Sequence, residues 1–427
     1  MSAHGMRGEQ LLSAGAKFAP APGFFARLFA PGFQKMLDRL DAGFERGSLR
    51  AHLPDGTIRV LGGRAPGFDV EVWLKDWRAL LRLATNGSVG WFQAYEAGEW
   101  EADSHPRLFA LMSDNVRALG STARSSGFFR LAGRFAHSLN RNSRKGAARN
   151  ISAHYDLGND FYGAWLGDLM SYSSALFSPS EQQNGTEALA EGQAEKIAAI
   201  AARADPPERG NVLEIGCGWG SQALFMADTQ NVHVDAISLS EEQLTWCRNR
   251  YQQRMGAIKG EVDFRYQDYR DVSGGYDAIV STEMVEALGR EYWPDFMDCV
   301  ARNLKPGGRA AIQYISMADD VFEDYAKSAD FIQAYVFPGG LLIKSSEFRT
   351  LAQERGLQWH DQYDFGQDYA RTLCLWRECF DEAIQQGRLP AGFDDRFIRL
   401  WRYYLSYCEG GFAAGTINVH QVTLVKS

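Results

Sequence analysis

Three alternating glycines are the first feature of this sequence that indicates ligand binding. They stand in the run Val212-Leu213-Glu214-Ile215-Gly216-Cys217-Gly218-Trp219-Gly220, between an expected strand and an expected helix. Glycine allows positive φ and a close approach of the backbone to a ligand. The dinucleotide fingerprint would have a glycine at Ser221 and an acidic residue where this chain has Ser238-Leu239-Ser240. Binding of a nicotinamide dinucleotide is therefore disfavoured.

Glu214, at the end of the expected strand, indicates a ligand that carries positive charge. S-Adenosylmethionine has an ammonium and a sulfonium group and no phosphate, so an acidic strand end beside a glycine turn suits it. The plainer alternative is a carboxylate that only stabilises the N-terminus of the following helix. The motif as a whole favours S-adenosylmethionine.

The elements that must hold this turn alternate between strand and helix from Pro206 onward. Helix-period segments separate the strands, such as Glu241 to Arg254 with Ser240 as its N-cap. The expected strands are Val212 to Ile215, Val232 to Ile237, Val262 to Tyr266, Tyr276 to Ser281 and Arg309 to Ile315. This order predicts an α/β fold with a doubly wound, mostly parallel sheet.

Composition and charge limit the class of protein. The chain has 427 residues, 45% of them hydrophobic and 23% charged, which predicts a large core and two domains. A formal net charge of -8 argues against a nucleic-acid-coating protein, so we expect no nucleic-acid partner. The six cysteines lack metal-ligand spacing, so we expect no metal site and a reducing, cytoplasmic compartment. No apolar run of 18 residues and no signal-peptide pattern occur, so we expect neither a membrane span nor export.

The N-terminal region has a different pattern. Alternating apolar residues around Pro54-Asp55-Gly56 predict two short strands, and a helical period runs from Trp73 to Leu83. These patterns predict a small α+β unit.

A basic aromatic segment follows this unit. Between Asn115 and Tyr155 the sequence has no acidic residue and eight cationic ones. The cationic residues are Arg117, Arg124, Arg130, Arg134, Arg141, Arg144, Lys145 and Arg149. Phe128, Phe129 and Phe135 interleave with them at near-helical spacing, as in a helix that lies on an anionic lipid surface. A solvated linker is the alternative interpretation.

Several further stretches carry the pattern of a known family. They are His154 to Tyr162, Met170 to Ala175, Ser238 to Gln243, Leu304 to Gly308 and Phe337 to Gly340. Together with Glu214 to Gly220, they resemble the cyclopropane-fatty-acid (cyclopropane-fatty-acyl-phospholipid) synthase family of S-adenosylmethionine-dependent methyltransferases. The similarity covers about residues 150 to 427. Gly87 to Gly90 and Tyr95 to Trp100 are also similar to the family members that act on intact phospholipids.

The resemblance implies a seven-stranded class I methyltransferase sheet with a smaller N-terminal α+β domain. It implies a lipid- or substrate-associated domain over residues 1–115, a basic linker or interfacial helix over 116–150 and a methyltransferase domain over 151–427. The implied substrate is an unsaturated phospholipid in the membrane, and the implied assembly is a homodimer. With the basic segment 117–149 on anionic lipid, we expect a cytoplasmic protein associated peripherally with the inner membrane surface.

The resemblance also assigns site residues. The implied cofactor contacts are Tyr172, Ser173, Glu214, Gly216, Cys217, Gly218, Gly220, Ser238, Leu239, Gln243, Tyr269 and Arg270. The family removes a proton with a bound bicarbonate, held by a Cys backbone, a Glu, a His, an Ile backbone and a Tyr. The matching positions here are Ser174, Glu286, Gln313, Ile315 and Tyr369. The chain thus departs from the family at Ser174 and at Gln313.

Family chemistry adds the sulfonium methyl to a cis double bond. An alkene has no proton for a base to remove beforehand, so catalysis comes from positioning and from stabilising the carbocation that follows. Gln313 cannot carry the positive charge of a histidine, which weakens the case for bicarbonate and ring closure. We therefore expect a methyl- or methylene-branched product, with a cyclopropane as the alternative. Methylation of a soluble small molecule and a catalytically silent lipid-binding protein are the other interpretations.

Overall fold

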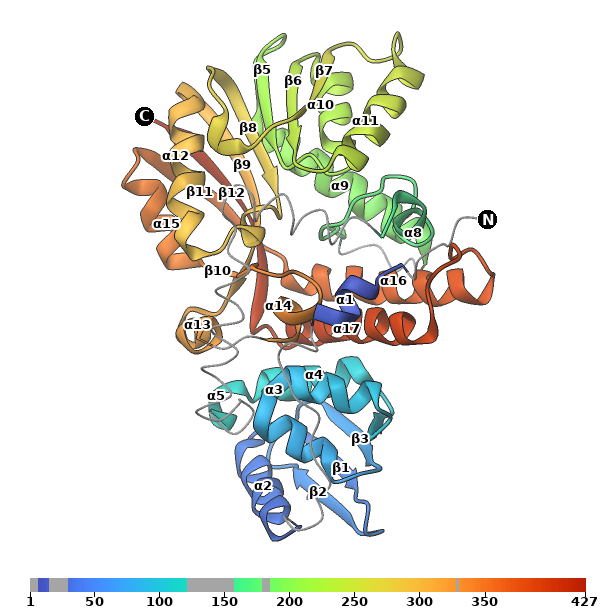
Figure 1. Cartoon of the computed structure of the whole chain (residues 1–427). Helices are drawn as coiled ribbons and strands as arrows, with labels where there is room; N and C mark the ends of the chain where they lie inside the picture. The colour runs from blue at the N-terminus through green and yellow to red at the C-terminus, as the bar shows by residue number, and fades with distance from the viewer. Residues whose placement is uncertain (1–6, 15–29, 121–156, 179–184, 328–329) are drawn as a thin grey trace. The chain divides into compact units, whose positions relative to one another are not determined.

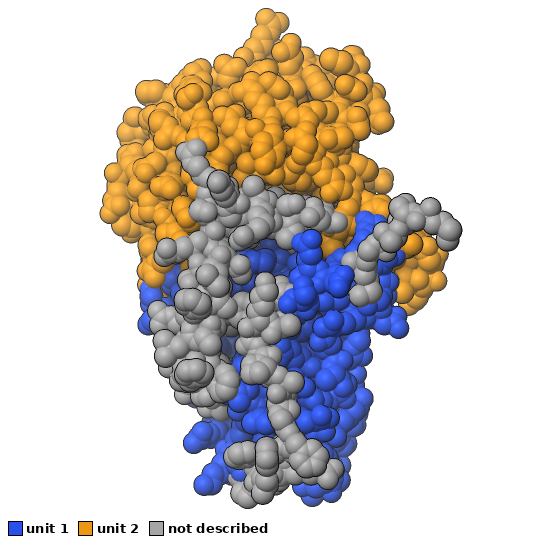
Figure 2. Space-filling model, viewed as in Figure 1, with its two compact units in different colours: residues 1–140, 320–338, 392–417 blue, residues 141–319, 339–391, 418–427 orange. Residues whose placement is uncertain are grey.

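The chain folds into two compact units in the computed structural model, which describes residues 7–14, 30–120, 157–178, 185–327 and 330–427 (Figure 1). Figure 2 shows the units in different colours. Unit 1 comprises residues 1–140, 320–338 and 392–417, and unit 2 comprises residues 141–319, 339–391 and 418–427. Each unit is therefore built from segments that are distant in the sequence.

A mostly parallel sheet forms the centre of unit 2. Its strands follow the order β11-β12-β9-β8-β5-β6-β7, and β10 pairs with β9. Neighbours from β9 through β7 are parallel, whereas β11 is antiparallel to β12. The strands are β5 (Asn211–Ile215), β6 (His233–Ser238), β7 (Glu261–Tyr266), β8 (Tyr276–Thr282), β9 (Leu304–Met317), β10 (Ile343–Lys344), β11 (Leu357–Asp364) and β12 (Ile417–Lys426). The predicted sheet is confirmed, with β10 as a short addition to the expected seven strands.

The helices of unit 2 lie on both faces of this sheet. Helix α10 connects β5 to β6 and helix α11 connects β6 to β7, and both lie on one face of the sheet (Figure 1). Helix α12 connects β8 to β9 and lies on the other face. Right-handed crossover connections produce this arrangement. The strand order reverses between β5 and β8, which is where sheets of this kind bind ligands. The helices are α8 (Asn159–Gly163), α9 (Thr186–Ala204), α10 (Ser221–Gln230), α11 (Glu241–Arg254), α12 (Trp293–Asn303), α15 (Ser345–Gln353) and α16 (Gly366–Gln385). Short 3-10 helices are η3 (Tyr269–Asp271), η4 (Val285–Ala287) and η5 (Arg290–Tyr292).

Unit 1 contains a four-stranded sheet of order β2-β1-β3-β4, in which only β1 and β3 run parallel. Its strands are β1 (Ser48–His52), β2 (Ile58–Gly62), β3 (Asp69–Leu74) and β4 (Trp100–Ala102). Its helices are α1 (Glu9–Ala14), α2 (Ala30–Gly43), α3 (Arg78–Glu96), α4 (His105–Asp114), α5 (Val116–Leu119), α13 (Asp319–Ala326, nearly all in this unit), α14 (Phe331–Tyr335) and α17 (Asp395–Ala413). Phe92 of α3 contacts the rings of Phe331, Tyr335 and Tyr403 at 4.7–5.0 Å between centroids, so one aromatic core joins the three segments of the unit.

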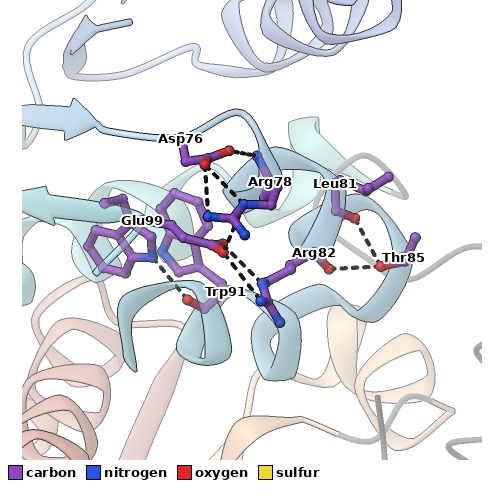
Figure 3. A network of polar contacts seen from close by, with 8 residues as sticks. Asp76, Arg78, Leu81, Arg82, Thr85, Trp91 and Glu99 are labelled. Carbon is purple, nitrogen blue, oxygen red and sulfur yellow. Dashed lines mark hydrogen bonds and ion pairs between the residues drawn. The ribbon is translucent and has the colours of Figure 1, made fainter. Parts of the chain in front are cut away.

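Helix α3 is broken at the motif Gly87-Ser88-Val89-Gly90. Gly87 has φ +58° and ψ −138°, and a Cβ on Gly90 would lie 2.0 Å from the carbonyl oxygen of Arg82. A polar network fixes the first half of the helix (Figure 3): Arg82 donates two hydrogen bonds, of 2.9 and 3.2 Å, to the buried carboxylate of Glu99. The two glycines therefore allow the two halves of α3 to lie close together.

One N-terminal expectation needs a correction. Trp73 belongs to β3 and not to a helix, because Val70, Val72 and Leu74 alternate into the core, and α3 begins only at Arg78. Arg117 lies on α5 and forms an ion pair with Asp320, 2.5 Å between Nε and Oδ2, so its charge is engaged within unit 1. The other seven cationic residues of the basic segment lie outside the described residues. No helix in the described part of the chain is long and apolar enough to cross a membrane.

Candidate active site

The glycine turn after β5 has the backbone conformation that its sequence requires. Gly216, Gly218 and Gly220 have φ of +81°, +50° and +80°. A Cβ on Gly220 would lie 3.0 Å from Cys247 and from Phe264, so this glycine packs the turn against its neighbours. At Gly218 a Cβ would meet no atom within 4 Å, so the turn presents backbone to open space there.

Glu214 is buried beneath this turn, with 4% of its surface exposed. The backbone N–H of Ala223, in the first turn of α10, donates to its carboxylate, and Oε2 has no hydrogen-bond partner among the described residues. Burial raises the pKa of Glu214 to about 8, and the nearby ammonium of Lys196 acts in the opposite direction. The carboxylate thus satisfies one helix N–H and keeps one oxygen for a ligand.

Two further polar atoms at the same edge of the sheet are buried without a partner in the described part of the chain. They are Nε2 of Gln243, on α11 after β6, and the hydroxyl of Tyr269, in η3 after β7. S-Adenosylmethionine offers an ammonium group, ribose hydroxyls and adenine nitrogens, which match the acceptor of Glu214 and the polar groups of Gln243 and Tyr269. The residues present therefore fit this cofactor.

Three other predicted cofactor residues, Ser238, Leu239 and Arg270, lie at or just after the ends of β6 and β7. Ser238, at the end of β6, donates from Oγ to Oε1 of Gln243 at 3.3 Å, and Leu239 follows it half-buried. Ser240 caps α11 as predicted, its Oγ accepting from the N–H of Gln243. The guanidinium of Arg270 bonds to Asp268 at 2.9 and 2.6 Å and lies over the ring of Tyr269, so it is engaged beside the site.

The segment Ser171-Tyr172-Ser173-Ser174 is held by the helices α9 and α16. Lys196 of α9, with 3% of its surface exposed, donates from Nζ to the hydroxyls of Ser171 and Ser173, both at 2.7 Å. Gln193 donates to the carbonyl of Ser173 at 2.8 Å, and Thr372 of α16 accepts from the N–H of Ala175 at 3.0 Å. These contacts fix the backbone N–H of Ser174.

That N–H donates to a carboxylate that the sequence analysis did not assign, Glu283. Oε1 of Glu283 accepts from the backbone of Ser174 at 2.9 Å and from Nε2 of Gln313 at 2.7 Å. Oε2 accepts from the hydroxyl of Tyr369 at 2.6 Å. Three of the donors that the resemblance assigns to bicarbonate therefore bind the Glu283 side chain.

The backbone of Glu283 is strained, since its φ of +49° lies in the left-handed region that side chains rarely adopt. Such strain is concentrated at functional sites. Burial raises the pKa of Glu283, and its hydrogen bonds from Tyr369, Ser174 and Gln313 and the charge of Lys196 oppose that rise. The three donors and the buried ammonium favour the carboxylate form.

Glu286 lies one turn further on, in η4. Its Oε1 accepts from the backbone N–H of Ile315, and its Oε2 is buried without a partner among the described residues. Burial and the neighbouring Glu283 raise the pKa of Glu286 to about 8. This pKa keeps Glu286 protonated at neutral pH, whereas Glu283 has the stronger hydrogen-bond donors to a carboxylate.

Aromatic side chains line this region. The ring centroid of Trp376 lies 5.3 Å from that of Tyr172 and 6.1 Å from that of Tyr369. Tyr162 continues the group, 5.5 Å from Tyr172 and 5.0 Å from Trp219. The faces of such rings stabilise positive charge in a dry site.

The structure brings together the five residues predicted to act in catalysis, Ser174, Glu286, Gln313, Ile315 and Tyr369. Their roles remain proposals. The sequence analysis missed Glu283, although an acidic residue at the end of a buried strand, three positions before Glu286, was a usable signal. No group of three or more potential ligands within the described ranges is arranged to hold a metal ion.

Comparisons with known proteins agree with this geometry. A family model described as mycolic acid cyclopropane synthetase matches residues 142–422. Tuberculostearic acid methyltransferase UfaA1 of Mycobacterium tuberculosis is 36% identical over 349 residues, which cover 81% of this chain and 80% of that protein. Cyclopropane-fatty-acyl-phospholipid synthase of Escherichia coli is 33% identical over 373 residues, with 86% and 90% covered. The solved mycolic acid cyclopropane synthase CmaA1, complexed with SAH and CTAB, shares the fold with a TM-score of 0.60 at 24% identity, over 65% of this chain and 98% of that one.

The fold, the family model and the two relatives together define a class I S-adenosylmethionine-dependent methyltransferase. The chain belongs to the mycolic acid cyclopropane synthetase family, whose model covers more than half of its length. The predicted family, the cofactor S-adenosylmethionine and the activity of a lipid-modifying methyltransferase are thereby confirmed.

Proposed function

We propose that this enzyme transfers a methyl group to a double bond of an unsaturated acyl chain in a membrane phospholipid and yields a methylene-branched chain. The observation that carries the proposal is the Glu283 carboxylate, held by Ser174, Gln313 and Tyr369 in an aromatic surrounding. When bound, S-adenosylmethionine supplies an electrophilic methyl group on its sulfonium.

The reaction places a positive charge on the acyl chain. One alkene carbon takes the methyl group, and the neighbouring chain carbon is left as a cation. The rings of Tyr172, Tyr369 and Trp376 stabilise this charge and exclude water that would quench it. A hydride shift from the methyl-bearing carbon moves the charge onto that more substituted carbon.

Glu283 then acts as the base. Its carboxylate takes a proton from the added methyl group, the electrons of that C–H bond form the new double bond, and Glu283 becomes a neutral acid. If a base instead takes the proton from the added methyl group before the hydride shift, the electrons of that C–H bond join the methyl carbon to the first cation and give the alternative product, a cyclopropane. The names of the two relatives, a methyltransferase and a cyclopropane synthase, span both outcomes. We favour the branch because Gln313 cannot supply the charge that would retain bicarbonate.

The Glu283 carboxylate accepts hydrogen bonds from Ser174, Gln313 and Tyr369, the donors that the resemblance assigns to bicarbonate. We therefore propose that the enzyme needs no bicarbonate for turnover. Turnover in bicarbonate-depleted buffer should equal turnover in buffer with added bicarbonate. Glu283→Gln should lower kcat by about 100-fold or more, the usual contribution of a general base. Glu283→Gly suits the positive φ and vacates the carboxylate position, so added bicarbonate should restore part of its activity.

Glu354→Gln, at an exposed position of unit 2, is the matched control and should leave kcat and its bicarbonate response unchanged. A wild-type enzyme that depends on bicarbonate, or a Glu283→Gln variant with full activity, would refute the assignment of Glu283 as base.

We also propose that the substrate is reached at an anionic bilayer, through the basic segment 117–149, by a homodimer bound peripherally to the cytoplasmic face of the inner membrane. Within this segment Arg117 is paired with Asp320. We therefore assign the contact with lipid to the cationic residues that follow Arg117. Replacing Arg130, Arg134 and Arg141 with Ser should weaken binding to anionic vesicles by about 100-fold, at about 1 kcal/mol per charge.

Vesicle sedimentation at low and high salt measures this effect, and wild-type binding should fall as salt rises. Equal activity of the triple variant on vesicles would instead favour a soluble substrate. Analytical ultracentrifugation of the wild type tests the homodimer separately.

A further inference from the structure

A chain of buried amides leads from Glu283 to the edge of the sheet. Nε2 of Gln313 donates to Glu283, and Oε1 of Gln313 accepts from Nε2 of Gln421 at 3.0 Å. Oε1 of Gln421 in turn accepts from Nε of Arg203 at 3.1 Å. Gln313 and Gln421 are fully buried, with 0% and 1% of their surfaces exposed.

The direction of this chain is set at its outer end. A glutamine amide has a donor side and an acceptor side and fits its surroundings in two orientations, whereas a guanidinium has donors only. Arg203 therefore requires the oxygen of Gln421 to face it. The nitrogen of Gln421 then faces Gln313, and the nitrogen of Gln313 faces Glu283. The opposite orientation would set the oxygen of Gln313 against the carboxylate.

The guanidinium of Arg203 is itself oriented by an irregularity in β11. The register of β11 against β12 shifts between His360 and Tyr363, and Asp361 has a φ of +50°. The carbonyl of Asp361 in this bulge accepts from Nη1 of Arg203. Bulges beside active sites commonly re-aim a group in this way.

We propose that Arg203 and Gln421 are positioning residues that lock the Gln313 amide with its N–H toward Glu283. We call the hydrogen bonds that run from Arg203 through Gln421 and Gln313 to Glu283 the relay. Its role rests on the proposed function of Glu283 as the base. It acts through Gln313, since neither Arg203 nor Gln421 bonds to Glu283. The relay explains how a glutamine serves at a position where either amide orientation is sterically possible.

The relay predicts a change in the pH dependence of turnover. The titratable groups that face Glu283 are Lys196 of α9, Tyr369 of α16 and Glu286 of η4, and all remain in the variants below. Loss of the Gln313 donor raises the pKa of Glu283, so the acid limb of the kcat profile moves to higher pH. A shift of about one unit lowers kcat about 10-fold on that limb.

The test compares four variants across the pH range on unsaturated phospholipid vesicles. Gln421→Met, which changes no charge, and Arg203→Met should both shift the acid limb by about one unit, with the KM for S-adenosylmethionine within about twofold of wild type. Arg203→Lys keeps a charged donor and should retain the wild-type profile. Gln230→Met removes a part-buried amide on α10 outside the relay and should also retain the wild-type profile.

A wild-type pH profile of kcat for Gln421→Met would overturn the relay. A shift of the acid limb in Arg203→Met that also occurs in Arg203→Lys would overturn it too. Failure of the proposed function has a different signature, because Glu283→Gln would then keep its full rate in the same assay. A thermal-unfolding scan of each variant separates a positioning effect from loss of the folded protein.

Discussion

At the scale of single residues, the site depends on two carboxylates that differ in their hydrogen bonds. Glu283 accepts from three donors, and Glu286 accepts from the backbone of Ile315 and keeps one buried oxygen unpartnered among the described residues. The sequence predicts the residue types around them, because the motifs fix Ser174, Gln313 and Tyr369. It does not predict that these groups converge on Glu283, because the convergence depends on the left-handed turn after β8.

Cofactor binding should release a proton from Glu214. The pKa of this carboxyl is raised to about 8 in the protein, and it must be ionised to face the ammonium of the cofactor. Affinity should therefore rise with pH from 6 to about 8, by up to about 10-fold per unit for one proton, and then level off. Calorimetry with S-adenosylhomocysteine in buffers of different ionisation enthalpy measures the proton release directly.

Glu214→Gln is the control for this effect, since its amide cannot titrate. It should bind S-adenosylhomocysteine with little release of protons. Proton release equal to that of the wild type would assign the effect to another group, of which the neighbouring Lys196, with a pKa lowered to about 8 by burial, is the candidate.

At the scale of elements, local rules predict some boundaries well and fail at others. Helix α11 runs from Glu241 to Arg254 behind its Ser240 cap, as its sequence predicts, because the cap and the strand before it are local signals. Trp73 fits a helical period with the residues after it, yet strand pairing with β1 and β4 places it in β3. Non-local pairing of this kind overrides a local period.

The break in α3 gives a prediction about stability. Gly90→Ala would place a Cβ 2.0 Å from the carbonyl oxygen of Arg82, so the two halves of the helix must move apart. We expect a loss of about 1–3 kcal/mol in the free energy of unfolding, as for other overpacked sites. Denaturant unfolding followed by circular dichroism measures it.

Gly32→Ala, in α2, is the matched control because a Cβ there meets no atom within 4 Å. It should leave stability unchanged or slightly raise it, since alanine favours a helix. Equal stability of the Gly90→Ala variant and the wild type would show that the close approach at Gly90 is not required.

At the scale of the whole molecule, the two units do not follow the linear order of the sequence. The predicted division at residues 115 and 150 is sequential, whereas unit 1 also includes residues 320–338 and 392–417. These segments join it because Phe331, Tyr335 and Tyr403 pack on Phe92 of α3. An aromatic residue in a sequence does not reveal which distant ring it will contact, so composition and motifs predict the parallel sheet but not this interleaving.

The most direct test of the account is the structure of the lipid product. Purified enzyme, S-adenosylmethionine with a trideuterated methyl group and vesicles of unsaturated phospholipid are incubated, and the fatty acid methyl esters are resolved by gas chromatography with mass spectrometry. We predict an acyl chain with a methylene branch that retains two deuterium atoms, because Glu283 removes the third from the transferred methyl group. A cyclopropane as the main product, or no label in the lipid, would contradict the account.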